Sequence, residues 1–272
     1  MECKVKDITI YYEERGSGRP FFTLHGWTGD HRGLLFDFEP FFEGRDNWRR
    51  IYFDLPGMGR TLGPAWLTHQ DQVLEVVLDF IDALAPGERF ALAGVSYGGL
   101  LARGVVQRRS AQMLGVFLFV PVITAKHAQR NVPLHKVIVE DAGFQAALLP
   151  EDKDLQDLLV VQSVETYEKF KIAIKPAIDM ADQAFLEKLS ENYGFSFDVD
   201  KLAEPFPAPA LILTGRQDSI CGYAEAYGIL ENYPRATYAV LDRAGHGLGW
   251  EQPALYRALF TEWLDRVDEY SK

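Results

Sequence analysis

Two periods of hydrophobicity divide the chain into predicted strands and helices. Residues 8–12 alternate between apolar and polar side chains as a strand does, and residues 21–24 and 50–54 are short, mostly apolar runs typical of strands. From residue 68 to residue 84, apolar side chains recur at helical spacing, with acidic side chains mostly on the other faces. The pattern therefore predicts strands followed by an amphipathic helix.

The same alternation continues after a turn at Pro86 and Gly87. It predicts strands at 90–94, 114–120, 210–214 and 238–241 and helices at 100–107, 223–231 and 253–267. Strands that alternate with helices favour an α/β fold, with a mostly parallel central sheet flanked by helices on both faces.

The alternation is interrupted between residues 122 and 206. Charged, strand-poor segments at 155–161, 165–174 and 184–189 have helical patterns there. We expect a core domain made of residues 1–121 and 207–272, with residues 122–206 inserted over the sheet.

Composition narrows the classes of partner. The 272 residues are 47% hydrophobic, which supports a sizeable core, and 39 acidic against 28 basic residues give a net charge of -11. This charge repels phosphate backbones and anionic membranes, so we expect no nucleic acid or membrane partner. The charged first residues and the lack of a long apolar run predict a cytoplasmic protein. Oligomeric state stays open.

No cofactor or metal is expected. Cys3 and Cys221 are the only cysteines, too few for a disulfide framework or a multi-cysteine zinc site, and the six histidines lack close metal-ligand spacing. No phosphate-binding P-loop occurs, and the glycine-rich loop at residues 57–63 misses the dinucleotide-binding pattern by one residue.

The sequence around Ser96 is the first candidate for chemistry. Gly94 and Gly98 flank this serine between a predicted strand and a predicted helix. Such glycines permit a sharp strand-to-helix turn that projects the serine oxygen outward, and the helix N-terminus then faces developing negative charge. The arrangement suits a nucleophile, although the pattern alone also fits a simple turn.

A serine nucleophile needs a base, and the base needs a carboxylate. Asp218 follows the strand at 210–214, and His246 follows the strand at 238–241. In a parallel sheet these loops emerge at the same edge as Ser96. Asp54 and Asp242 are rival carboxylates.

These motifs, together with His25-Gly26-Trp27 after the strand at 21–24, resemble the α/β-hydrolase family over essentially the whole chain. The resemblance implies the α/β-hydrolase fold with residues 122–206 as a helical cap. It also implies Ser96 as nucleophile, His246 as base and Asp218 as the acid that orients it. The backbone N–H groups of Trp27 and Tyr97 would form the oxyanion hole.

Two histidines near this loop have other candidate roles. We expect His25, with Gly26, to support the oxyanion loop by hydrogen bonding rather than to transfer protons. His31 is a candidate substrate contact at the rim of the site.

The chain is therefore predicted to be a serine hydrolase that opens a small ester, thioester, lactone or amide through an acyl-enzyme. C–C bond hydrolysis, lyase chemistry and perhydrolysis remain alternatives on the same fold, as do a proline-type aminopeptidase and a small-molecule receptor with an intact triad. A serine in the strand-to-helix turn at residue 96 disfavours haloalkane and epoxide cleavage, because these reactions need an aspartate nucleophile at that position.

Overall fold

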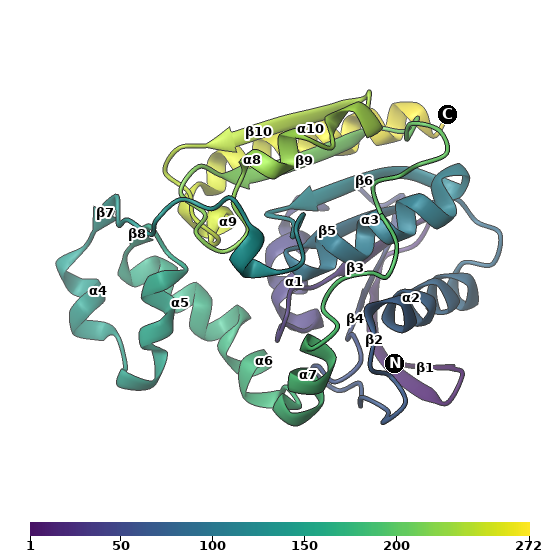
Figure 1. Cartoon of the computed structure of the whole chain (residues 1–272). Coiled ribbons are helices and arrows are strands. Elements are labelled where there is room, and N and C mark those ends of the chain that lie inside the picture. The colour runs from purple at the N-terminus through teal and green to yellow at the C-terminus, as the bar shows by residue number, and fades with distance from the viewer.

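A single eight-stranded sheet runs through the protein. The computed structural model describes residues 1–272, and its central sheet has the strand order β1-β2-β4-β3-β5-β6-β9-β10 (Figure 1). The strands are β1 (Glu2–Val5), β2 (Ile8–Arg15), β3 (Arg19–Leu24), β4 (Trp48–Phe53), β5 (Phe90–Val95), β6 (Met113–Phe119), β9 (Ala210–Gly215) and β10 (Ala236–Leu241). The pairings β1/β2 and β2/β4 are antiparallel and all others are parallel. The predicted mostly parallel sheet is confirmed.

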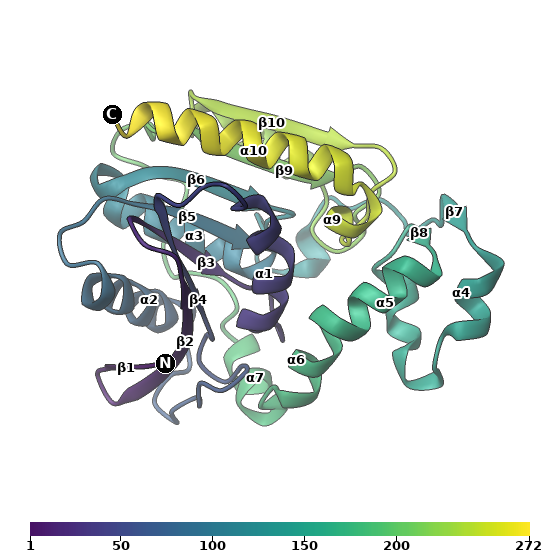
Figure 2. The same ribbon diagram turned by 180° about the vertical axis from the view of Figure 1, so that it is seen from behind.

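Helices cover both faces of this sheet. α1 and α10 pack on one face and α2 and α3 on the other, as the two opposite views in Figures 1 and 2 show. The helices outside the inserted segment are α1 (His31–Phe38), α2 (Gln70–Leu84), α3 (Tyr97–Arg109), α8 (Ala224–Tyr227), α9 (Leu248–Glu251) and α10 (Pro253–Tyr270). No helix is both long and apolar enough to cross a membrane.

The helix α2 shows how the local sequence determines an element. The His69 side chain accepts a hydrogen bond from the Asp71 N–H, and the Gln72 side chain accepts one from the His69 N–H, so backbone donors at the helix start are satisfied. Its apolar stripe then buries Val73, Val77 and other side chains against the sheet.

Residues 122–206, here called the insertion, separate β6 from β9. Its elements are β7 (Val139–Glu140), α4 (Ala142–Ala147), β8 (Val161–Gln162), α5 (Val164–Ala173), α6 (Lys175–Met180) and α7 (Gln183–Ser190). They lie beyond the carboxyl ends of the parallel strands (Figure 1). A separate cluster of five buried residues forms within it: Phe144, Leu155, Leu159, Tyr167 and Phe170.

Arg103 of α3 holds both ends of the insertion. Its guanidinium donates to the carbonyl oxygens of Val122 (2.8 Å) and Ile123 (3.1 Å) at the start of the segment. It also pairs with Asp200 near the end, with 2.9 Å between Nε and Oδ1. The Arg103 side chain is only 1% exposed, so this cation is stabilised by the groups it holds.

Several elements differ from the sequence-based expectation. Residues 155–161 are not an α-helix: a 3₁₀ segment (Pro150–Asp157) is followed by β8, because the N–H groups of Val160 and Val161 donate to the Glu251 carboxylate. The helix expected at 223–231 is divided by Gly228 into α8 and a short 3₁₀ turn. The pattern does not predict β1, α1, β7, α4, α6 or α9.

Candidate active site

The turn between β5 and α3 places Ser96 at the carboxyl edge of the sheet. Ser96 has a positive φ of 53° with ψ at -112°, a strained conformation for a residue with a side chain. The turn closes tightly, since a Cβ on Gly98 would lie 2.1 Å from the Leu24 carbonyl oxygen and one on Gly94 would lie 2.3 Å from the Gly98 carbonyl oxygen. Only glycine fits at these two positions.

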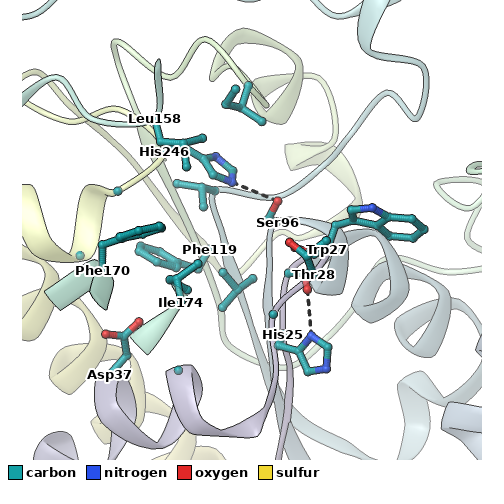
Figure 3. A pocket seen from close by; sticks show the side chains of 18 of the residues that line it. His25, Trp27, Thr28, Asp37, Ser96, Phe119, Leu158, Phe170, Ile174 and His246 are labelled. Carbon is teal, nitrogen blue, oxygen red and sulfur yellow. Dashed lines mark hydrogen bonds between the residues drawn. The ribbon is translucent and has the colours of Figure 1, made fainter. Parts of the chain in front are cut away.

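Ser96, His246 and Asp218 lie in line. The Asp218 carboxylate can only accept, so Nδ1 of His246 donates to its Oδ2 (3.0 Å), and Nε2 of the neutral ring accepts from the Ser96 hydroxyl (3.1 Å, Figure 3). Asp218 is fully buried, and its Oδ1 accepts from the N–H groups of Ile220 (2.8 Å) and Cys221 (3.0 Å). The carboxylate therefore fixes both the tautomer and the orientation of the imidazole.

The electrostatics of His246 follow from this pairing. Burial by itself lowers the pKa of His246, but the adjacent Asp218 carboxylate, with Cys221 beside the ring, holds the pKa well above its usual value of 6.5. The ring is thus a stronger base than a free histidine.

Neither rival carboxylate contacts His246. Asp242 is exposed, and its nearest polar partner is Gln217 at 3.4 Å. Asp54 is buried and accepts from the His31 N–H (2.8 Å), from Nδ1 of His31 (2.7 Å) and from the Arg60 N–H (2.8 Å). Among the three candidate acids, the structure brings Asp218 alone to the imidazole.

His25 joins two loops below Ser96. Its Nε2 accepts from the Leu55 N–H (2.9 Å), so Nδ1 carries the proton and donates to the Gly26 carbonyl (2.8 Å). Burial is the main cause that lowers the pKa of His25, so the ring stays neutral. This geometry fits a supporting rather than a proton-transferring residue, and Gly26 lies against Ser96.

Trp27 and Tyr97 present backbone N–H groups beside Ser96. The Trp27 N–H donates to no group of the protein. Tyr97 is the first residue of α3, where an N–H has no intrahelical acceptor. The two rings pack edge to face with centroids 5.0 Å apart, and the Tyr97 hydroxyl donates to Gln70. The side chains therefore stiffen the loop while the amides stay available.

His31 does not reach the site. It is buried, donates to Asp54 and packs against Tyr11, and it is absent from the cavity wall. The expected substrate contact at His31 is therefore not supported. The sequence pattern could not reveal its partner, because Asp54 lies 23 residues further along the chain.

A cavity of about 400 Å³ opens beside Ser96 and His246. Just over half of its lining residues are hydrophobic, which is typical of small-molecule sites. The core contributes Trp27, Phe119 and Trp250, and the insertion contributes side chains such as Phe170 and Ile174 (Figure 3). Substrate would thus contact both parts of the chain.

The sequence analysis missed Glu251. This buried carboxylate accepts three backbone hydrogen bonds, from Gly245 (2.6 Å), Val160 (2.6 Å) and Val161 (2.9 Å). It therefore connects the loop that carries His246 to the insertion. Burial raises the pKa of Glu251 and the three N–H donors only partly oppose that rise.

Cys221 lies beside the proposed nucleophile. Its Sγ is 3.8 Å from Oγ of Ser96 and the side chain is buried, whereas Cys3 is partly exposed. Asp218, Cys221 and His246 form one cluster of metal-ligating residue types, and Asp30, His31 and Asp54 form another. Hydrogen bonds within the protein account for the second cluster, and the Asp218–His246 pair accounts for most of the first.

The comparisons with known proteins agree with this fold. A model of the alpha/beta hydrolase family matches residues 21–259. The chain belongs to the α/β-hydrolase family and is an enzyme of the hydrolase type, as the motifs around Ser96 and His246 predicted.

Individual relatives span nearly the whole chain. The crystal structure of an alpha/beta superfamily hydrolase from Oenococcus oeni PSU-1 is 30% identical, has a TM-score of 0.88 and covers 98% of this chain and 99% of its own. A pimeloyl-[acyl-carrier protein] methyl ester esterase of Legionella pneumophila is 26% identical over 94% of this chain and 100% of its own. A 2-hydroxy-6-oxo-6-(2'-aminophenyl)hexa-2,4-dienoic acid hydrolase of Metapseudomonas resinovorans is 22% identical over 95% of this chain and 88% of its own.

Proposed function

We propose that the protein hydrolyses a small carboxylic ester, or a related thioester, lactone or amide, through an acyl-enzyme on Ser96. The observation that carries this proposal is the aligned chain of hydrogen bonds from Ser96 through His246 to Asp218 at the wall of an apolar cavity. The resemblance to a named methyl ester esterase supports the ester as the first substrate class.

The first half of the reaction forms the acyl-enzyme. Oγ of Ser96 attacks the substrate carbonyl while its proton passes to Nε2 of His246, and Asp218 stabilises the imidazolium. The N–H groups of Trp27 and Tyr97 stabilise the oxyanion of the tetrahedral intermediate. His246 then gives its proton to the leaving alcohol as the C–O bond breaks.

The second half returns the enzyme to its starting state. Water takes the place of the alcohol, loses a proton to His246 and attacks the acyl carbonyl. The imidazolium then protonates Oγ of Ser96 as the carboxylic acid leaves. No group from outside the chain is needed except water.

We also propose that the insertion acts as a helical cap, with residues 1–121 and 207–272 as the core domain. Support comes from the insertion side chains in the cavity wall and from their place beyond the carboxyl ends of the strands. Such a cap would exclude water and set the shape of the acyl or alcohol subsite.

The decisive experiment combines labelling with turnover. Wild-type protein is expected to react with a fluorophosphonate probe at Ser96 and to hydrolyse small aryl esters. Ser96→Ala should fold normally and lose both reactions, with kcat reduced on the order of 10⁴-fold or more. A cleanly prepared Ser96→Ala protein that keeps over about a tenth of wild-type turnover would falsify the serine nucleophile.

C–C bond hydrolysis is the second candidate. One relative is named for a dienoic acid substrate, and the Arg130 guanidinium lines the cavity while donating only to the backbone carbonyls of Thr124, Ala125 and Ile220. A cation without a carboxylate partner can attract a substrate carboxylate. Faster turnover of a dienoic ring-cleavage product than of any aryl ester would favour this candidate.

A further inference from the structure

Asp37 places an uncompensated carboxylate in the wall of the cavity. It belongs to α1, and its Oδ1 accepts from the indole Nε1 of Trp250 at 3.0 Å. Oδ2 accepts no hydrogen bond from the protein, and Asp37 takes part in no ion pair. The nearest cation is Lys169 of α5, whose ammonium already bonds Glu165 at 2.6 Å.

The other carboxylate of the cavity wall, that of Asp30, has a counter-ion, whereas Arg130 is a cation and cannot be compared with Asp37 in this respect. Asp30 caps α1 and pairs with Arg32, and the Arg130 guanidinium donates to three backbone carbonyls. Asp37 is therefore the lining carboxylate that lacks a counter-ion.

The surroundings of Asp37 favour the binding of a hydrogen-bond donor to its carboxylate. Burial raises the pKa of Asp37 to about 6, a rise that the bond from Trp250 and the charge of Lys169 oppose. Asp37 is only partly exposed and its Oδ2 faces the cavity without a partner from the protein, so a matching donor would be favoured there.

Apolar side chains separate Asp37 from the nucleophile. In Figure 3, Phe119 and Ile174 lie between Asp37 and Ser96, and Phe170 lies beside them. A substrate that reaches from Ser96 to Asp37 must therefore pass an apolar section before it meets the carboxylate.

We propose that Asp37 determines specificity, and that the substrate presents a hydrogen-bond donor, an ammonium or hydroxyl group, to it at the end remote from the scissile carbonyl. This inference rests on the proposed ester hydrolysis at Ser96. A methyl-terminated chain would remove water from Asp37 without replacing its hydrogen bonds, so the same residue also rejects plain aliphatic substrates.

The test uses two matched series of esters over a range of chain lengths. In the first, aryl esters carry acyl chains that end in an ammonium, hydroxyl or methyl group; in the second, acetate esters carry the same three groups on the alcohol. For wild-type protein we expect kcat/KM to favour the ammonium over the methyl terminus by at least about 10-fold in one series, the effect of one charge-assisted hydrogen bond.

Variants assign the preference to Asp37. Asp37→Leu should abolish or reverse it, whereas Asp37→Asn, whose amide oxygen can still accept from Trp250, should keep a preference for hydroxyl and lose that for ammonium. Asp179→Asn is the matched control, since it removes one exposed carboxylate of the insertion that pairs with Lys175. It should leave the ranking unchanged.

The outcomes separate this inference from the proposed function. Turnover and Ser96 labelling without any donor preference in either series, or the same ranking in Asp37→Leu as in wild type, would overturn the role of Asp37 alone. Loss of labelling and turnover in the wild-type protein would overturn both.

Discussion

The basicity of His246 depends chiefly on one neighbouring charge. Asp218 is the nearest carboxylate to the ring, and the pKa of His246 lies well above 6.5 because that charge outweighs the effect of burial. Since the neutral ring is the form that accepts the Ser96 proton, kcat/KM should rise with pH and level off above this raised pKa.

Changing Asp218 tests this cause. In Asp218→Asn the carboxylate no longer opposes the effect of burial and only Cys221 still raises the pKa, so the pKa of His246 should fall below its wild-type value, and kcat should fall by about 10⁴-fold as the tautomer is lost. The pKa can be measured by NMR titration of the ring in a Ser96→Ala background, and kcat with a fluorogenic ester.

Asp242→Asn is the control for this prediction. Its carboxylate is exposed and contacts Gln217 rather than the imidazole, so both kcat and the pKa of His246 should stay unchanged. The assignment of the acid would be wrong if Asp242→Asn were the damaging change and Asp218→Asn were mild.

At the scale of elements, Glu251 connects the end of α9 to two separate loops. Its Oε1 accepts from Val160 and Val161, and its Oε2 accepts from Gly245 next to His246. A glutamine at this position has only one acceptor oxygen. The backbone N–H groups that donate to the other oxygen in Glu251 would then face an amide N–H₂, which cannot accept.

Glu251→Gln should therefore reduce stability by about 1–3 kcal/mol, the cost of leaving a buried backbone donor without a partner. We also expect kcat to fall more than KM rises, because the loop of His246 loses its support. Urea denaturation and steady-state kinetics measure the two effects. Glu262→Gln, which changes an exposed carboxylate paired with Arg266 on α10, is the matched control. Equal behaviour of the two variants would contradict a positioning role for Glu251.

The same elements explain what the sequence could predict. The turn at Ser96 and the loops with Asp218 and His246 follow strands with strong local hydrophobic patterns, so their common edge could be inferred. Glu251 could not be found in this way, because two of its partners lie about 90 residues earlier in the chain. Asp37 lies in α1, whose short amphipathic stretch did not stand out from the surrounding loops.

Long-range contacts also account for the misplaced elements. The segment before β8 has a helical pattern of apolar residues. The N–H groups of Val160 and Val161 nevertheless donate to the Glu251 carboxylate, and not to carbonyl groups of a helix. Likewise, His31 was expected at the rim of the site, whereas it is buried and donates to Asp54. Periodicity indicates which face of an element is apolar. It does not indicate which distant polar group will accept hydrogen bonds from the backbone N–H groups.

At the scale of the whole molecule, several polar contacts join the insertion to the rest of the chain, and two of them are made by the buried charged side chains of Glu251 and Arg103. Glu251 holds its middle, and Arg103 holds both ends against α3. The insertion's own cluster of five buried residues is small beside the two clusters that enclose the sheet. The insertion also packs Leu186, Leu189 and Phe206 into the larger cluster on one face of the sheet, so its stability depends on polar and apolar contacts with the core as well as on its own cluster.

The position of Arg103 has a consequence for how the protein melts. Because the helix that follows Ser96 carries the cation that binds both ends of the insertion, neither part can unfold without breaking the hydrogen bonds and the ion pair of Arg103. Wild-type protein should show one cooperative calorimetric transition. Arg103→Met should show two, with the insertion lost first, while Arg108→Met, an exposed change on the same helix, keeps one. Between its two transitions, Arg103→Met should still react with a small phosphonate at Ser96 but should no longer discriminate among esters. A single transition in Arg103→Met would show that other contacts hold the insertion.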